Sequence, residues 1–306
     1  MLYRETQSEL TFRKAGTFYH IYTSPLESDI LYRNDDELNI IINFIAIAIM
    51  FCNCRILAFA VMSNHIHFII EGPESECIKF FYSLKEKLTT FFRYNGRPGL
   101  VDSIEPGCTL INSLEQLRTE IAYVIRNPFV ARTDVNPFAC SMTSGHLYFN
   151  PLLKKEGVPA NTLKGRVLRD FTRSRKEIEL TDSIYVQDGV AQAWSFVDYE
   201  RAMSFFDSAQ QFIMTTLKNV EAQVEVALRY NDPVHLNDQE LVAVTMKICR
   251  EELGQDKPSD MPPREKMMLA TILKNRYHVS NAQAARASGL LLKDVDALFP
   301  FAAKHK

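Results

Sequence analysis

The chain has 306 residues, 46% hydrophobic and 24% charged, and is therefore long enough for a substantial core and two domains. Its 35 basic and 37 acidic residues give a net charge of −2, which does not favour DNA binding over the whole surface. The six cysteines form no C-x-x-C pair, there is no cleavable signal pattern, and the apolar run at residues 40–52 is too short to span a bilayer. We therefore expect a cytoplasmic protein with reduced thiols and no membrane partner.

The first 150 residues predict alternating strands and helices, from the spacing of their apolar residues. In chain order, the predicted elements are a strand at 17–23, a helix at 35–51, strands at 55–61 and 65–71, a helix at 75–94 and a strand near 108–111. This β-α-β-β-α-β order is that of the ferredoxin-like, or split βαβ, arrangement. We expect an α+β protein with a catalytic domain of this kind at residues 1–150.

Two histidines, His65 and His67, flank a single apolar residue in the strand predicted at 65–71. Side chains repeat every second residue along a strand, so both imidazoles point to the same face. Two neutral nitrogen ligands side by side are a start for a divalent-metal site. The alternative is a pair of histidines that only pack and form hydrogen bonds on a half-buried face.

A helix is predicted to follow, because Ser113 with Gln116 three residues later forms a capping-box start. Its apolar stripe consists of Leu114, Leu117, Ile121 and Ile125. Tyr123 lies away from this stripe, with Asn127 on the same side one turn later. Pro128 disfavours helical geometry at Asn127, so we expect the helix to end there. An ordinary surface tyrosine before a helix stop is the alternative.

Two segments resemble one known family. Residues 62–67, Met-Ser-Asn-His-Ile-His, are similar to the M-x-N-H-x-H box of the HUH-type single-tyrosine transposases. Residues 123–131, Tyr-Val-Ile-Arg-Asn-Pro-Phe-Val-Ala, resemble the Y-I-x-x-N-P-V-x-A segment of the REP-associated branch of that family. Shorter matches are Tyr-His-Ile at 19–21 and Phe-Arg-Tyr-Asn at 92–95. The resemblance covers about the first 150 residues, and its two main boxes are specific together, in this order and spacing.

The resemblance implies metal-dependent cleavage and rejoining of single-stranded or hairpin DNA. Tyr123 would attack phosphorus and form a 5′-phosphotyrosine with a free 3′-hydroxyl. His65 and His67 would hold the metal, and Asn127 would supply a third, oxygen ligand. Mg²⁺ or Mn²⁺ suits phosphate oxygens and mixed ligands better than a closed zinc site does. Relatives of this type include monomers and swapped dimers, so a homodimer is one expected assembly.

Two stretches carry a basic surplus that suits a DNA backbone. Residues 79–132 contain eight basic and five acidic residues, and residues 154–176 contain eight basic and two acidic residues. The candidate DNA-binding residues are Lys85, Arg93, Arg97, Arg126, Lys164, Arg166 and Arg169. A solvated face and a charged linker are the alternative for these stretches.

Residues 151–306 predict a second, mostly helical domain, because Asn-Pro at 150–151 and Gly-Val-Pro at 157–159 indicate a boundary. The predicted helices are 199–217, 220–229, 238–253, 264–277, 281–287 and 291–299. Ser280 is a plausible N-cap for the fifth helix, and Gly289 is a turn residue, so residues 280–299 predict a helix-turn-helix. Two aspartates in its second helix would face DNA badly, and plain helical packing is therefore the favoured alternative.

The chain also departs from the family pattern. Residues 100–109 are acidic where the family has an aromatic, basic stretch, and residues 140–144 replace its W-S-S box. Both changes put a hairpin substrate in question but leave the metal and nucleophile positions intact. A non-catalytic DNA-binding regulator derived from a transposase is therefore a second expectation, and a structural protein is a third.

Overall fold

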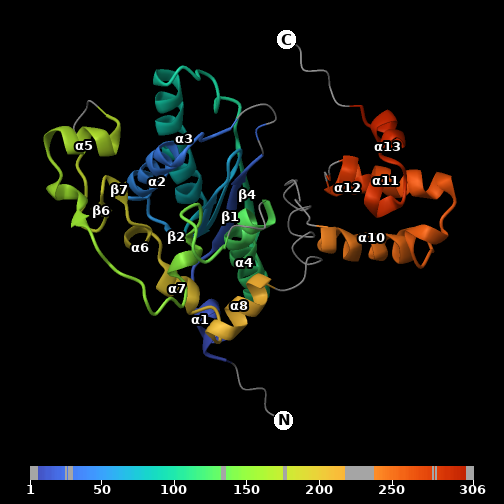
Figure 1. Cartoon of the computed structure of the whole chain (residues 1–306). Coiled ribbons are helices and arrows are strands. Elements are labelled where there is room, and N and C mark those ends of the chain that lie inside the picture. The colour runs from blue at the N-terminus through green and yellow to red at the C-terminus, as the bar shows by residue number, and fades with distance from the viewer. Residues whose placement is uncertain are drawn as a thin grey trace. The chain divides into compact units, whose positions relative to one another are not determined.

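A computed structural model describes residues 6–24, 26, 30–131, 136–174, 178–217, 238–277, 279 and 281–300 (Figure 1). Contacts divide the chain into two compact units, Met1–Phe129 with Asp134–Leu217, and Val130–Thr133 with Lys218–Lys306. The division between the larger parts falls near residue 217, whereas the sequence predicted a boundary near residue 150. The first unit is a mixed α+β structure that contains a four-stranded antiparallel sheet.

The four-stranded sheet and four helices make up the described part of residues 6–131. In chain order the elements are α1 (Gln7–Arg13), β1 (Phe18–Thr23), α2 (Asp35–Ile49), β2 (Arg55–Val61), β3 (Ile66–Glu71), α3 (Glu74–Tyr94), β4 (Pro106–Ile111) and α4 (Leu114–Ala131). The strand order is β2-β3-β1-β4, and every neighbouring pair is antiparallel. The strands and helices predicted for this part of the chain are confirmed to within a few residues at each end.

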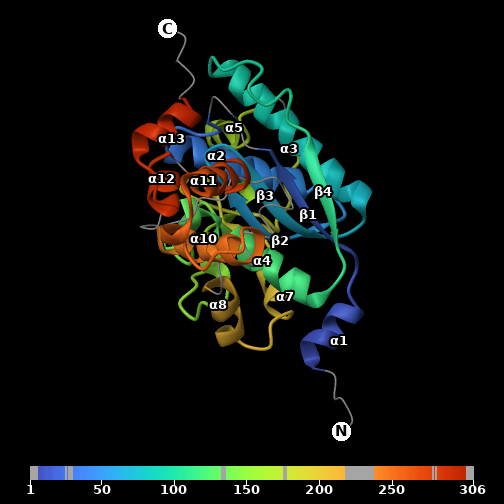
Figure 2. The same cartoon turned by 90° about the vertical axis from the view of Figure 1, so that its right-hand side faces the viewer.

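Helices cover both faces of this sheet, so β3 is buried along its whole length. On one face, Phe68 of β3 meets Phe80 of α3, with ring centroids 5.0 Å apart. Helix α2 packs beside α3 on that side, where Phe44 lies against Phe91. On the other face α4 crosses the strands, as the two views in Figures 1 and 2 show. The residues that alternate with Phe68 along β3 therefore face α4.

Residues 136–217 pack against this sheet instead of starting a new domain. Their elements are the 3-10 helices η1 (Ser144–Leu147) and η2 (Ala160–Thr162), strands β5 (Val158–Pro159), β6 (Tyr185–Gln187) and β7 (Val190–Ala191), and helices α5 (Gly165–Thr172), α6 (Ala193–Phe196), α7 (Tyr199–Met203) and α8 (Ala209–Leu217). The buried amide of Asn43 in α2 accepts from the Ala191 N–H and donates to the Gly189 carbonyl, at 2.7 and 2.9 Å. Asp198 N–H donates to the Ile56 carbonyl of β2.

Two sequence predictions fail in this segment. It contains a three-stranded sheet, β5-β6-β7, in a stretch that was predicted to be mostly helical and for which no strand was predicted, because strands of two or three residues are too short to show a period. The Asp188-Gly189 pair, with φ of 51° and 81°, turns β6 into β7 and is a hairpin signal that the sequence carried. The helix predicted at 199–217 is two helices, since Ser208 caps a new start by accepting from Gln211 N–H.

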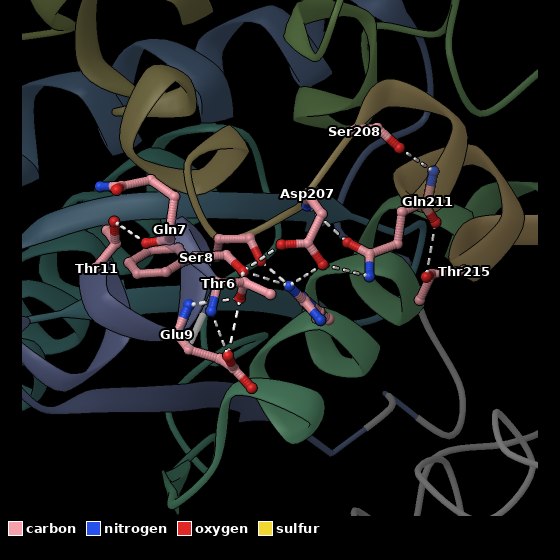
Figure 3. A network of polar contacts seen from close by, with 11 residues as sticks. Thr6, Gln7, Ser8, Glu9, Thr11, Asp207, Ser208, Gln211 and Thr215 are labelled. Atoms are coloured by element: carbon pink, nitrogen blue, oxygen red, sulfur yellow. Dashed lines mark hydrogen bonds and ion pairs between the residues drawn. The ribbon is translucent and has the colours of Figure 1, made fainter. Parts of the chain in front are cut away.

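A polar network fixes helices α1, α4 and α8 at one end of the first unit (Figure 3). Thr6 and Glu9 form the capping box of α1. Ser8 donates to Asp207, and the guanidinium of Arg118 in α4 contacts both, at 2.8 Å to Ser8 Oγ and 2.9 Å to Asp207 Oδ2. This network holds the N-terminal half of α4 in one position.

The second unit is helical in its described part. Its elements are α10 (Asp238–Glu252), the 3-10 helix η3 (Pro258–Asp260), α11 (Pro263–Tyr277), α12 (Asn281–Ser288) and α13 (Leu292–Leu298). Gly289, with φ of 69°, turns α12 into α13, and the side chain of Asn281 joins them by donating to Asp296 Oδ1 at 2.9 Å. The predicted helix at 220–229 and the predicted cap Ser280 lie outside the described residues. DNA binding by a helix-turn-helix at 280–299 stays a prediction.

Two general features concern the whole described chain. All six cysteines are free thiols. Within the described ranges, every helix is too short or too polar to cross a bilayer.

Candidate active site

Strand β3 brings His65 and His67 to the face of the sheet that α4 covers. His65 immediately precedes β3, His67 is its second residue, and their ring centroids are 4.9 Å apart. Both rings are buried. His65 Nδ1 lies 2.7 Å from the Asn64 side-chain oxygen, while His67 pairs in register with Tyr22 of β1. The same-face arrangement predicted from the strand period is therefore present.

Helix α4 points Tyr123 at these histidines. Its first turn is capped by Ser113 Oγ, which accepts from Gln116 N–H at 3.1 Å. The Tyr123 ring lies 5.6 Å from the His67 ring at an interplanar angle of 83°. Tyr123 is 7% exposed, so it is not the ordinary surface tyrosine that was the alternative interpretation. The helix buries the stripe that contains Ile121 on one side and its tyrosine face on the other.

The helix does not end at Asn127, as the sequence predicted, but continues through Pro128 to Ala131. A proline inside a helix removes one backbone hydrogen bond and disfavours helical geometry before it, yet neither effect forbids one further turn in a packed helix. Asn127 therefore stays on α4, one turn beyond Tyr123 on the same face, and is buried.

The donor set has the chemistry that a divalent ion requires. Two imidazoles on one face are present, and an amide oxygen from Asn127 on α4 would complete a mixed nitrogen and oxygen set that suits Mg²⁺ or Mn²⁺ better than a closed zinc site. Among the residues that the structure describes, no three His, Cys, Asp or Glu side chains are grouped to hold a metal ion. A site of two histidines and one amide needs no such group, so the donor set fits.

Two residues that the sequence reasoning left without a role, His20 and Glu120, complete the cluster. His20 Nε2 lies 3.0 Å from His67 Nδ1, and His20 Nδ1 lies 2.8 Å from Glu120 Oε2. His20 comes from β1 and Glu120 from α4, one turn before Tyr123, and both side chains are fully buried. A glutamate three residues before the tyrosine, on the tyrosine's own face, is the sequence signal that could have found it.

The seven residues predicted to contact DNA lie in different surroundings. Lys164, Arg166 and Arg169 are exposed on or beside α5, and Arg93 is exposed near the end of α3. Lys85 binds Glu105 Oε1 at 3.0 Å. Arg126 is buried, and Arg97 is 6% exposed with its guanidinium 2.7 Å from Glu37. A phosphate could reach Arg97 only by breaking that ion pair.

In comparisons with known proteins, no family model, no curated protein and no solved structure matches the chain.

Proposed function

We propose that this chain is a metal-dependent enzyme that cleaves and rejoins single-stranded DNA through a phosphotyrosine intermediate, in the manner of a transposase. The observation that carries the proposal is the contact of Tyr123 from α4 with His67 of β3, whose rings are 5.6 Å apart, while the His65 ring lies 4.9 Å from that of His67. A tyrosine hydroxyl beside a two-imidazole donor set is an arrangement that suits metal-assisted transfer of a phosphoryl group from DNA to a protein.

We also infer that the first unit has the ferredoxin-like, split βαβ arrangement. The chain order β-α-β-β-α-β and the strand order β2-β3-β1-β4 support this, because β1 and β2 are separated by β3 and all neighbours are antiparallel. In such an arrangement the connecting helices share one face, and the other face is left for α4. The six free thiols support a cytoplasmic location.

In the proposed reaction, Tyr123 Oη forms a bond to phosphorus while the bond from phosphorus to the 3′ oxygen breaks. The phenolic proton is released and the departing 3′ oxygen takes up a proton, so the step is balanced. A 3′-hydroxyl attacks the phosphotyrosine in the reverse step, joins the strands and restores the phenol. The energy of the cleaved bond is kept in the covalent link, so no nucleotide triphosphate is required.

A tyrosine hydroxyl needs help to react, because its ordinary pKa is about 10. A divalent ion supplies that help when bound, by polarising the scissile phosphate and stabilising the charge that develops on it. His65, His67 and Asn127 would hold it. The packing of His67 against Tyr123 keeps the phenol ring beside one of the two imidazoles, which reduces the entropic cost of reaching the reactive geometry.

One observation favours the second candidate, a DNA-binding regulator without catalysis. Tyr123 and Asn127 are both buried, so a DNA strand reaches the phenol only after a rearrangement of the groups that cover it. An enzyme must make that rearrangement, whereas a regulator need not. Capture of a covalent intermediate therefore separates the two candidates.

The test uses the full chain, Mn²⁺ and a pool of hairpin-containing single-stranded oligonucleotides with randomised flanks, because the target sequence is unknown. We expect a covalent adduct that survives denaturant. Tyr123→Phe should abolish it, whereas Tyr94→Phe, which changes a phenol that is 80% exposed, should retain it. An adduct that persists in Tyr123→Phe would show that another residue is the nucleophile.

A metal titration makes the test independent of the DNA sequence. The wild type should bind Mn²⁺, and His65→Ala and His67→Ala should bind it much more weakly while remaining folded by circular dichroism. Absence of both the adduct and Mn²⁺ binding in the wild type contradicts the enzyme and leaves the regulator.

A further inference from the structure

A buried chain of hydrogen bonds runs from α4 to the imidazole of His67. Glu120 Oε2 lies 2.8 Å from His20 Nδ1, and His20 Nε2 lies 3.0 Å from His67 Nδ1. All three residues are 0% exposed. The proposed reaction uses only His67 among them, so the other two need a separate explanation, because burying a carboxylate and an imidazole costs free energy unless their contacts repay it.

The donors and acceptors in this series of hydrogen bonds follow from the contact at its first residue, Gln116. The backbone N–H of Asn112 donates to Gln116 Oε1 at 3.0 Å, and a backbone N–H cannot accept. The NH₂ group of Gln116 must therefore be the one that faces Glu120, whose Oε1 it reaches at 3.4 Å. Glu120 thus accepts from Gln116 on one oxygen and contacts His20 with the other. We take Glu120 in the ionised form, which is the ordinary form of a carboxyl group at neutral pH.

The positions of the ring hydrogens on His20 and His67 follow from the ionised form of Glu120. A carboxylate only accepts, so His20 Nδ1 carries the hydrogen and donates to Glu120. In a neutral His20 the other nitrogen, Nε2, is then an acceptor, and it receives the hydrogen on His67 Nδ1. His67 then carries its hydrogen on Nδ1 and its lone pair on Nε2, on the opposite side of the ring from the bond to His20.

We propose that Glu120 and His20 are positioning residues that hold His67 in the tautomer that presents Nε2 to a divalent cation. A histidine ligand must offer a lone pair, and a hydrogen bond from its other nitrogen to a fixed acceptor sets both tautomer and ring orientation. Here the acceptor is a second imidazole, which is itself set by the carboxylate. The inference rests on the proposed function, because it assigns these residues to the same metal site.

Glu120→Gln tests the direction of the chain with a change of few atoms. Gln116 would still donate to the amide oxygen at position 120, so the new NH₂ group would face His20 Nδ1. His20 would then carry its hydrogen on Nε2 and donate to His67 Nδ1. The hydrogen of His67 would move to Nε2, where it blocks metal coordination. Glu115→Gln is the matched control, since it makes the same change on the exposed side of α4.

The readouts are the tautomer of His67 and the affinity for Mn²⁺. The chain has seven histidines, so ¹⁵N labelling of histidine in the full, metal-free protein gives a tractable set of ring signals, and His67→Gln assigns the one that matters. We expect the wild type and Glu115→Gln to show His67 protonated at Nδ1. Glu120→Gln should shift it toward Nε2 and weaken Mn²⁺ binding about 10-fold to 100-fold, as loss of a partner behind a metal ligand commonly does.

Two results would overturn the inference. One is a wild-type His67 that carries its hydrogen on Nε2, a measurement that needs no variant and so stands even if Glu120→Gln does not fold. The other is Mn²⁺ binding that is equal in the wild type and a folded Glu120→Gln, which removes the positioning role but leaves the proposed function intact. A wild type that binds no Mn²⁺ contradicts both the proposed function and the positioning role of Glu120 and His20.

Discussion

Glu71 and Arg201 form a two-point ion pair that joins the end of β3 to helix α7. Arg201 Nε lies 3.0 Å from Glu71 Oε2, and Arg201 Nη2 lies 2.9 Å from Glu71 Oε1. Burial alone would raise the pKa of Glu71, but the bonds from Arg201 and from the Gly16 N–H outweigh it and lower that pKa below its ordinary value. The pair is a direct link between the main sheet and a segment more than a hundred residues later.

The first prediction concerns the pH dependence of this ion pair. Glu71→Gln should reduce the free energy of unfolding by about 2 kcal/mol at neutral pH, because it leaves a partly buried guanidinium with a weaker partner. The folded pKa of Glu71 lies below the unfolded one, so its contribution is complete above the unfolded pKa, about 4.3, and is lost as pH falls through the folded value. The unfolding free energies of the wild type and the variant in urea should therefore converge only as the pH falls below the folded pKa of Glu71.

Arg55→Ala is the control for that measurement. Its guanidinium lies 3.5 Å from Asp198, and its side chain is 63% exposed, so the loss should stay below about 0.5 kcal/mol. A Glu71→Gln deficit that does not depend on pH would mean that packing, and not charge, holds α7 to the sheet.

The second prediction is that the stable fragment ends near residue 217 and not near residue 150. A chain of residues 1–150 would lose the partners of Asn43 on β7 and the bond from Asp198 to Ile56 in β2. Buried polar groups without partners cost about 1–3 kcal/mol each, so we expect this fragment to aggregate or to lack a cooperative thermal transition. Residues 1–217 should melt cooperatively. A cooperative melt of the shorter fragment would contradict the assignment of residues 151–217 to the sheet.

Features of this fold and site that depend on neighbouring residues in the sequence can be predicted, whereas features that depend on contacts between distant residues cannot. Strand β3 is predictable from a local apolar run and helix α4 from a local apolar period. The residue spacing of a strand and of a helix then places His65, His67 and Tyr123. His20 and Glu120 meet across a hundred residues, and no local pattern reports which nitrogen faces which oxygen. The placement of residues 151–217 is also set by distant contacts, such as those of Asn43, which in the sequence only interrupts an apolar run.

The third prediction separates the basic residues by what surrounds them. Replacing Lys164, Arg166 and Arg169 together by alanine should lower the affinity for single-stranded DNA and flatten its salt dependence, because three exposed positive charges that are accessible to phosphates are lost. The melting temperature should change little. Arg97→Ala should lower the melting temperature and leave the DNA affinity of the folded protein unchanged. The reason is that Arg97 binds Glu37 and the Ile30 carbonyl in a buried site.

Fluorescence anisotropy at several salt concentrations and a thermal melt check both variants. Loss of DNA affinity in Arg97→Ala at a temperature where it is fully folded would show that Arg97 contacts DNA after all. An unchanged salt slope in the triple variant would show that residues 164–169 are a solvated face, which was the alternative from the sequence.

The fourth prediction concerns Gly107 and the ring of Tyr22. A Cβ at Gly107 would lie 2.2 Å from Tyr22 Cζ, so the ring lies directly over the β4 backbone. That ring also stacks beside His67, with centroids 6.4 Å apart and planes 25° apart. Gly107→Ala should therefore displace Tyr22, cost about 1–3 kcal/mol of stability and weaken Mn²⁺ binding through His67. In the Tyr22→Ala background the same glycine change should cost almost nothing, because the clash is gone. Chemical unfolding of the four proteins in this double-mutant cycle gives the coupling directly, and additive effects would mean that Tyr22 does not depend on Gly107 for its position.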